Sequence, residues 1–186
     1  IQPSTHGDVL HDESRIVDFR IDFSSDDDDW FPQLRDFYQL DWTLPARVTV
    51  DRHLLQDVGV RFKGASSYSL TPGTKKKSFD LDMNAAFGNQ RLYGYRKLNL
   101  NNGYIDPTMV REVLFQEISR RYVPAAKANL AKLSVNGTNW GVYTSVQQIN
   151  RDFLEEWFPN GKGNLWRGMI KPFRSARPFA WVGEDE

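Results

Sequence analysis

The sequence contains no cysteine and only three histidines, His6, His11 and His53. The missing cysteine excludes disulfides, thiolate zinc sites and cysteine nucleophiles. Two histidines lie in the acidic N-terminal segment and the third in an expected turn, so we expect neither a histidine-based metal site nor a serine triad. Charge of one sign is also missing, because 24 Lys and Arg balance 24 Asp and Glu. The total charge therefore gives no reason to expect nucleic acid or an anionic membrane as a partner.

Long hydrophobic runs are absent as well. No run approaches the roughly 18 apolar residues that a membrane span needs, and the N-terminus lacks the basic and then apolar pattern of a signal peptide. We therefore expect no membrane span. The chain begins with Ile1 rather than Met, which suggests a processed product, a shortened form or part of a longer protein. Its 186 residues, 40% of them hydrophobic, are enough for the core of one ordinary domain.

Charges of each sign are unevenly distributed along the chain. Residues 61–97 carry eight basic residues against only Asp80 and Asp82. This local excess suits phosphates or carboxylates, and a solvated basic sheet face is the alternative interpretation. Residues 1–36 are acidic, and the run Asp26–Asp29 is interpreted as a helix start rather than a calcium loop, because it lacks the alternating ligands and central glycine of such a loop.

Hydrophobic periodicity predicts an α+β domain. Apolar and polar residues alternate as in strands over residues 16–23, 46–51, 56–63, 76–83, 130–135 and 140–148. Helices are expected to begin after Ser24 or Ser25, at Asp106 and at Asn150, and Pro124 blocks continuation of the second. Asn136-Gly137 predicts a β-hairpin between the last two strands. This order indicates a largely antiparallel sheet with helices packed on it.

Common catalytic motifs are missing, and the candidate for a binding residue is instead a lysine, Lys77. The sequence has no Walker phosphate loop, dinucleotide fingerprint or serine elbow. Lys77 falls on the same strand face as Phe79 and Leu81, so its ammonium is expected to point inward and to need an acidic or anionic partner. The following helix offers Glu112 and Glu117, and the choice between them stays open. In kinases a strand lysine paired with a helix glutamate holds nucleotide phosphates.

Several motifs in order resemble one family. They are Gly59-Val60-Arg61-Phe62-Lys63-Gly64-Ala65-Ser66-Ser67, Lys76-Lys77-Ser78-Phe79, Lys97-Leu98-Asn99-Leu100-Asn101-Asn102, Asp106-Pro107-Thr108-Met109-Val110-Arg111-Glu112, Val135-Asn136-Gly137, Trp140-Gly141-Val142-Tyr143, Gln148, Asp152-Phe153-Leu154 and Gly163-Asn164-Leu165-Trp166. Together they make residues 14–168 similar to the spore-coat protein H (CotH) kinase family. The domain organisation expected is a loose lead-in over residues 1–13, a CotH-kinase-like N-lobe over 14–168 and an irregular aromatic and proline-rich tail over 169–186.

The resemblance implies a fold like the small lobe of a protein kinase, in a family whose members transfer phosphate from ATP, with magnesium, to protein serine residues. Carried over position by position, it implies that Lys77 contacts phosphate and that Glu112 or Glu117 orients it. It also implies that the end of the strand at Ser145–Ile149 faces adenine. The cofactor-binding residues expected are Lys77, Glu112, Glu117, Arg61, Ser66, Ser67, Gln147 and Gln148. An exported, surface or coat-associated setting is favoured by the same resemblance.

The family's catalytic base and magnesium-binding aspartates come from a later segment than this chain contains, so no catalytic residue is expected here. One hypothesis is that the chain is the nucleotide-binding part of a CotH-like kinase. The alternative is a noncatalytic, pseudokinase-like binding or structural subunit of a larger assembly. Aromatic and arginine side chains near the end, such as Trp166 and Arg167, suit a protein interface, and packing on the sheet is the other interpretation. The partners expected are other protein subunits or a missing C-terminal half.

Overall fold

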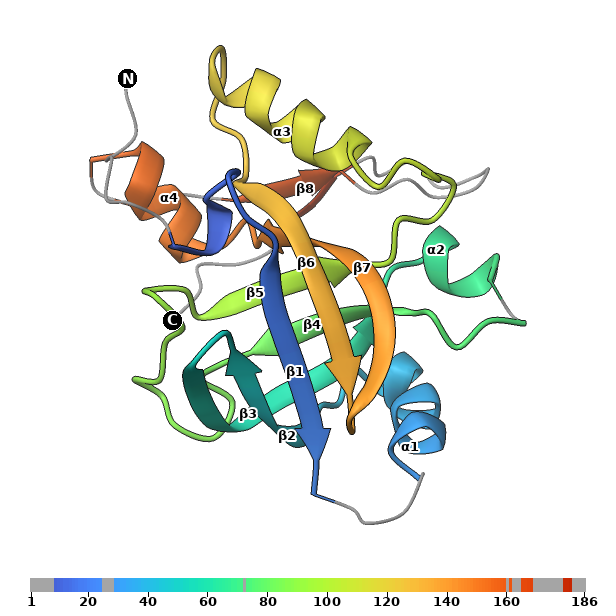
Figure 1. Ribbon diagram of the computed structural model, residues 1–186. Helices are drawn as coiled ribbons and strands as arrows, with labels where there is room; N and C mark the ends of the chain where they lie inside the picture. The colour runs from blue at the N-terminus through green and yellow to red at the C-terminus, as the bar shows by residue number, and fades with distance from the viewer. Residues whose placement is uncertain are drawn as a thin grey trace. The chain divides into compact units, whose positions relative to one another are not determined.

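Seven strands form a closed barrel in the computed structural model, which describes residues 9–24, 29–71, 73–159, 161, 165–168 and 179–181. The barrel strands are β1 (Val17–Phe23), β2 (Leu44–Val50), β3 (His53–Lys63), β4 (Ser78–Asp82), β5 (Lys97–Asn101), β6 (Ala128–Val135) and β7 (Thr138–Gln147). Their order around the barrel is β1-β2-β3-β4-β5-β7-β6. All neighbours are antiparallel except β1 and β6, which pair in parallel and close the barrel, as Figure 1 shows.

The helices are short. They are α1 (Trp30–Phe37), α2 (Ser66–Ser69), α3 (Arg111–Arg120) and α4 (Arg151–Trp157), and single 3₁₀ turns cover Val9–His11 and Tyr38–Leu40. The described residues from 9 to 148 lie in one compact unit, and the described residues from Ile149 onward lie in a second. The second unit contains α4, which begins at the predicted cap Asn150, and the paired strands β8 (Trp166–Gly168) and β9 (Phe179–Trp181).

The expected α+β fold with packed helices, resembling a kinase small lobe, is therefore wrong. The structure is a closed barrel, and only 23% of the described residues lie in helices. One reason is that β5 was not predicted as a strand, so the sheet lacked the element that joins β4 to β7. The other is that the pairing of β1 with β6 joins Val17 to Ala131, a contact over a long stretch of chain that no local pattern reports.

The barrel interior is the core, and the alternating residues of the strands fill it. Side chains that are fully or almost fully buried include Phe19, Ile21, Val48, Val60, Phe62, Phe79, Leu81, Leu98, Leu100, Leu133 and Tyr143. Helix α1 adds Trp30 and Leu34 to this core. The hairpin predicted at Asn136-Gly137 is confirmed, with φ values of 44° and 74°. The Asn136 side chain also accepts a hydrogen bond from the amide of Phe23 at 2.8 Å and so ties the turn to β1.

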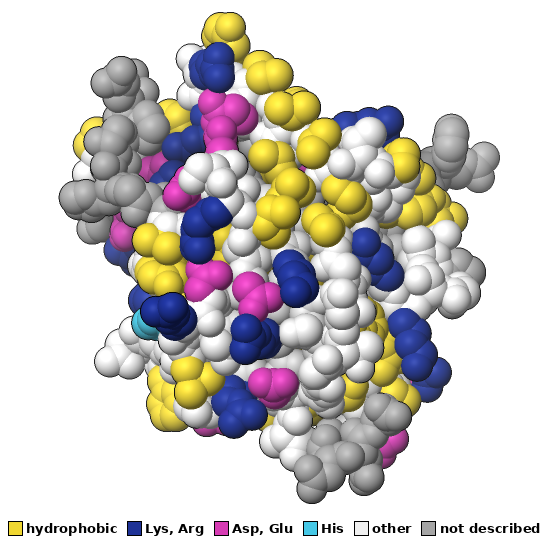
Figure 2. All heavy atoms as spheres, in the orientation of Figure 1, with side chains coloured by type: hydrophobic (Ala, Val, Ile, Leu, Met, Phe, Trp, Pro, Cys, Tyr) yellow, Lys and Arg dark blue, Asp and Glu magenta, His cyan; other side chains and the backbone are white. Residues whose placement is uncertain are grey.

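Helix α3 differs from its prediction in where it begins and in which of its side chains face the barrel. It begins at Arg111 rather than at Asp106, because Met109 has a φ of 60° and interrupts the helix. Val113 packs against a small cluster on the barrel's outer surface, but Leu114 and Ile118 are 54% and 55% exposed. Hydrophobic side chains gather on the face that carries α3 in Figure 2. The apolar arc of this helix therefore points away from the barrel, opposite to the expectation.

Asn129 on β6 fixes the segment before β1 to the barrel. It is 3% exposed, and its amide nitrogen donates to the carbonyl oxygens of Asp12 at 2.8 Å and Arg15 at 3.1 Å. It also reaches the carbonyl of Leu10 at 3.4 Å. One buried amide group thus donates to the carbonyls of this turn and holds the turn against β6.

We predict that Asn129→Asp lowers the free energy of unfolding by about 2–3 kcal/mol, because a buried carboxylate would face carbonyl oxygens that need a donor. Urea denaturation of both proteins measures this difference. Asn139→Asp is the control, because the exposed Asn139 only accepts a hydrogen bond, from the amide of Gly141. Equal losses in the two variants would contradict the role given to Asn129.

Candidate functional site

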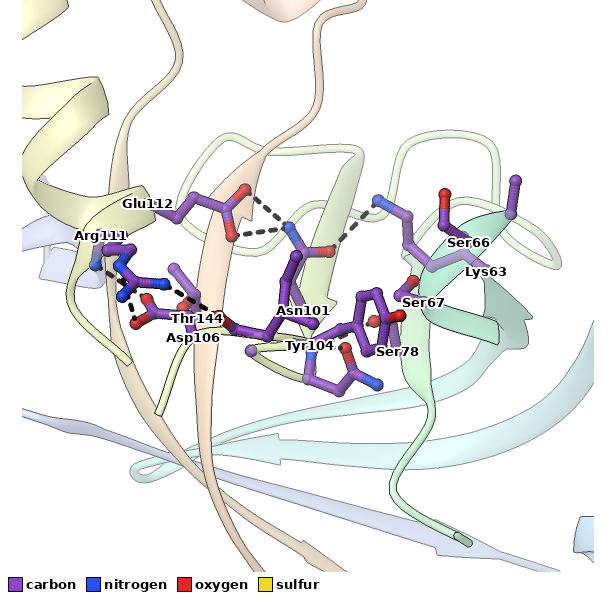
Figure 3. Close-up of a pocket in the computed structure, with 15 residues that line it drawn as sticks. Lys63, Ser66, Ser67, Ser78, Asn101, Tyr104, Asp106, Arg111, Glu112 and Thr144 are labelled. Atoms are coloured by element: carbon purple, nitrogen blue, oxygen red, sulfur yellow. Dashed lines mark hydrogen bonds and ion pairs between the residues drawn. The ribbon is translucent and has the colours of Figure 1, made fainter. Parts of the chain in front are cut away.

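A cavity of about 600 Å³ opens on the outside of the barrel, at one end of β3, β4 and β5. Its walls come from the residues that follow β3, from the loop between β5 and α3, and from the first turn of α3. The volume lies within the range of about 300–1,000 Å³ that is typical of ligand sites. Figure 3 shows polar side chains from all of these elements directed into the same space. The cavity is the candidate functional site.

Three side chains form a hydrogen-bonded chain across this cavity. Both carboxylate oxygens of Glu112 accept from Asn101 Nδ2, at 2.8 Å and 3.0 Å. Asn101 Oδ1 in turn accepts from Lys63 Nζ at 3.4 Å, as the dashed lines in Figure 3 mark. A lysine and a helix glutamate are therefore connected at the site through an asparagine.

The wall next to Lys63 carries hydroxyl groups. Strand β3 ends at Lys63, and the next residue, Gly64, has a φ of 89° that turns the chain into α2 and places Ser66 and Ser67 along the cavity. Tyr38 fixes this turn, because its hydroxyl donates to the Gly64 carbonyl at 2.6 Å. An ammonium beside two hydroxyls is a set of donors suited to an anionic ligand.

The opposite wall is the loop from Asn102 to Val110, which has an unusual backbone. Gly103, Ile105 and Met109 all have positive φ values, and such a conformation is rare for a β-branched residue like Ile105. Residues held in this region persist only where their surroundings fix them. Asp106 provides that fixation, because its carboxylate accepts from the Thr108 and Arg111 amides at 3.1 Å and 2.9 Å. The hydrogen bond from the Thr108 hydroxyl, followed by these amides and Arg111, lowers the pKa of Asp106.

Of the residues predicted from the sequence, Ser66, Ser67 and Glu112 line this cavity. Glu117 does not, because its carboxylate pairs with Arg121 at 3.0 Å on α3. Of the two glutamates, Glu112 therefore lies at the cavity and Glu117 does not.

Lys77 is buried, as expected, but its ammonium lies elsewhere. It donates to the Tyr68 carbonyl at 3.0 Å and to the carbonyl and hydroxyl of Thr71, and it lies 4.8 Å from the centre of the Tyr68 ring. It is 5% exposed, and burial lowers its pKa. The expected pairing with Glu112 or Glu117 is not found in the described part of the chain, where the ammonium holds the loop after α2. Contact of Lys77 with phosphate stays a prediction.

The remaining predicted residues also lie outside the cavity walls. Arg61 pairs with Asp80 at 2.8 Å and with Asp41. Gln147 accepts from the Lys127 amide at 3.1 Å, which ties the end of β7 to the start of β6. Gln148 has a buried Oε1 with no hydrogen-bond partner among the residues that the structure describes. A role for Gln147 and Gln148 beside adenine stays a prediction.

Sequence reasoning missed Lys63 and Asn101. The alternation of Phe62 with Lys63 puts Lys63 on the outer face of the barrel, where an argument based on an inward-pointing amine does not search. Asn101 is the last residue of β5. The sequence of this strand, Lys-Leu-Asn-Leu-Asn, alternates polar and apolar residues as a strand does. Applying the same periodicity test to residues 97–101 would have found that strand.

Within the described ranges, no group of three or more histidine, cysteine, aspartate or glutamate side chains could hold a metal ion. Likewise, no helix in the part of the chain that the structure describes is long and apolar enough to cross a membrane. The C-terminal arginines and aromatics of the expected tail at residues 169–178 lie outside the described residues.

Comparison with known proteins agrees with the motifs that line this cavity. The family model described as CotH kinase protein matches residues 60–179, which include Lys63, Asn101 and Glu112. No curated protein matches the chain. Because the match covers more than half of the sequence, the chain belongs to the CotH kinase family.

We predict that Lys77→Met lowers the free energy of unfolding by about 1–3 kcal/mol, because the loop carbonyls at Tyr68 and Thr71 lose a buried donor. Thermal or urea unfolding measures the change. Lys75→Met, at an exposed neighbouring position, is the control. If both variants unfold like the unaltered protein, the ammonium of Lys77 does not hold this loop.

Because the pKa of Asp106 is lowered, we predict that the difference in thermal stability between the unaltered protein and Asp106→Asn depends on pH. The carboxylate stabilises the fold fully above its ordinary pKa of 3.8, and this stabilisation is lost as the pH falls through the lowered folded-state value. Thermal midpoints recorded from about pH 7 to about pH 2 should therefore differ at the upper end and converge at the lower end. Asp36→Asn, on the exposed end of α1, is the control, and a gap that stays constant to the lowest pH would contradict this role.

Proposed function

We propose that the cavity binds the phosphate groups of a nucleotide and that the chain is the nucleotide-binding part of a CotH-like protein kinase. The observation that carries the proposal is the Lys63 ammonium, which faces a cavity of about 600 Å³ and is connected through Asn101 to the helix residue Glu112. The barrel differs from a kinase small lobe, so the proposal depends on the site and on family membership rather than on the fold.

The donors present fit phosphate chemistry. Lys63 supplies a positive charge, and the hydroxyls of Ser66 and Ser67 can donate to phosphate oxygens. The nearby carboxylates are already occupied, Glu112 by Asn101 and Asp106 by Thr108 and Arg111.

Magnesium fits this site as part of the nucleotide complex. The ion prefers oxygen ligands, keeps several waters and is held largely by substrate phosphates in phosphoryl-transfer sites. Glu112 and Asp106 are the carboxylates that line the cavity. Bound with the nucleotide, magnesium would neutralise phosphate charge, whereas Lys63 and the serines would orient the phosphates.

We predict that Lys63→Met weakens binding of magnesium ATP at least about tenfold, the loss expected for one charge-assisted contact. Isothermal titration calorimetry measures the affinity, and Lys77→Met is titrated in parallel because that lysine was the residue expected from the sequence. Tripolyphosphate should compete with ATP, and adenosine should compete poorly, because the phosphates provide the recognised charge. Equal ATP affinities of the unaltered protein and Lys63→Met would overturn the proposal.

The noncatalytic binding or structural subunit is a second candidate function, favoured by the outward apolar arc of α3. Phe115 and Tyr122 are 65% and 82% exposed, beside the exposed Leu114 and Ile118. Another protein subunit that buries these side chains would gain hydrophobic stabilisation. In that function the cavity would bind no nucleotide, so the calorimetric titration separates the two candidates.

A further inference from the structure

The connection between Glu112, Asn101 and Lys63 has a defined direction. A carboxylate only accepts hydrogen bonds and an ammonium only donates them, whereas an amide side chain does both from opposite ends. Asn101 places its nitrogen 2.8 Å and 3.0 Å from the two Glu112 oxygens and its oxygen 3.4 Å from Lys63 Nζ. The reverse orientation would put oxygen against carboxylate and NH₂ against ammonium. Only the observed orientation satisfies both neighbours.

The barrel explains why an intermediate residue is needed. Lys63 ends β3 and Asn101 ends β5, and β4 lies between these two strands. Two strand spacings separate them by about 10 Å, and Glu112 of α3 contacts Asn101 at the end of β5. On β4, the residue opposite Lys63 is Ser78, whose small side chain also lines the cavity. The lysine can therefore extend across β4 to Asn101, which in turn contacts Glu112.

The backbone of Asn101 is fixed independently of its side chain. Asn101 pairs with Thr144 of β7, and the next residue, Asn102, donates its amide to Ser78 Oγ at 3.0 Å. Both neighbouring contacts are buried or half-buried. Replacing the Asn101 side chain should therefore alter the connection to Lys63 more than it alters the strand.

We propose that Asn101 is a positioning residue, which holds the Lys63 ammonium toward the cavity while Glu112 holds Asn101. This inference rests on the proposed function, in which Lys63 binds nucleotide phosphate. The neutral amide of Asn101 stands between the two charged groups, and its nitrogen contacts the Glu112 carboxylate while its oxygen contacts the Lys63 ammonium.

Asn101→Asp tests this role, because it replaces the amide donor with a second carboxylate. At neutral pH the introduced carboxylate repels Glu112 and pairs directly with Lys63, so magnesium ATP should bind about tenfold more weakly. Two adjacent carboxylates raise the pKa of one of them, and a shared proton restores a donor toward Glu112 and an acceptor toward Lys63. The ATP affinity of this variant should therefore approach that of the unaltered protein as the pH falls from about 8 to about 5.

Asn101→Leu is the companion variant. Leucine has a similar size but neither donor nor acceptor, so ATP binding should weaken without any recovery at low pH. Asn139→Asp near the start of β7 is the matched control for added charge and should bind ATP like the unaltered protein at every pH. Thermal unfolding of each variant checks that it is folded before titration.

The outcomes separate the inference from the proposed function. If the unaltered protein binds no ATP, the proposed function is wrong and the positioning role fails with it. If ATP binding depends on Lys63 but both Asn101 variants bind like the unaltered protein, the nucleotide site stands and the positioning role is overturned. Weaker binding by Asn101→Asp with no recovery at low pH would also overturn it, because a general structural defect explains that result.

Discussion

Parallel pairing between β1 and β6 joins residues 17–21 to residues 131–135 and turns a sheet into a barrel. The interior can then be filled by alternate side chains of all seven strands, with Phe19, Phe79 and Tyr143 among the largest that are fully buried. Buried apolar side chains occupy the inside, and the candidate site lies on the outer surface. Closure of the barrel therefore determines both where the core is and where chemistry is possible.

The site lies where several strands end together. Strands β3 and β5 place Lys63 and Asn101 at the same end of the barrel, and the strained loop after β5 directs α3 so that Glu112 meets them. Apart from Val113, which packs against the barrel, helix α3 consequently turns its apolar side chains outward. The same orientation that brings the glutamate to the cavity thus creates the exposed hydrophobic surface visible in Figure 2.

Local patterns in the sequence predicted the strands that alternate strongly, such as β1 and β3, and the hairpin at Asn136-Gly137. They also predicted the cap of α4 at Asn150. Of the cavity-lining residues, Glu112 was proposed as a partner of Lys77, and Ser66 and Ser67 came from the family resemblance rather than from a local pattern. Closure was not predictable from these patterns, because it depends on a contact between distant strands. Lys63 was missed because periodicity tells which face a side chain occupies but not that three strand ends and a helix make that face concave.

The matched family region begins at Val60, within β3, so β1, β2 and the first part of β3 precede it. Those preceding strands supply hydrogen-bond partners for β6 and for the rest of β3. A protein trimmed to the matched residues would leave these backbone amides and carbonyls open, as a template on which other chains could add strands. Such a fragment should aggregate, so the smallest well-behaved version of this protein must start before β1.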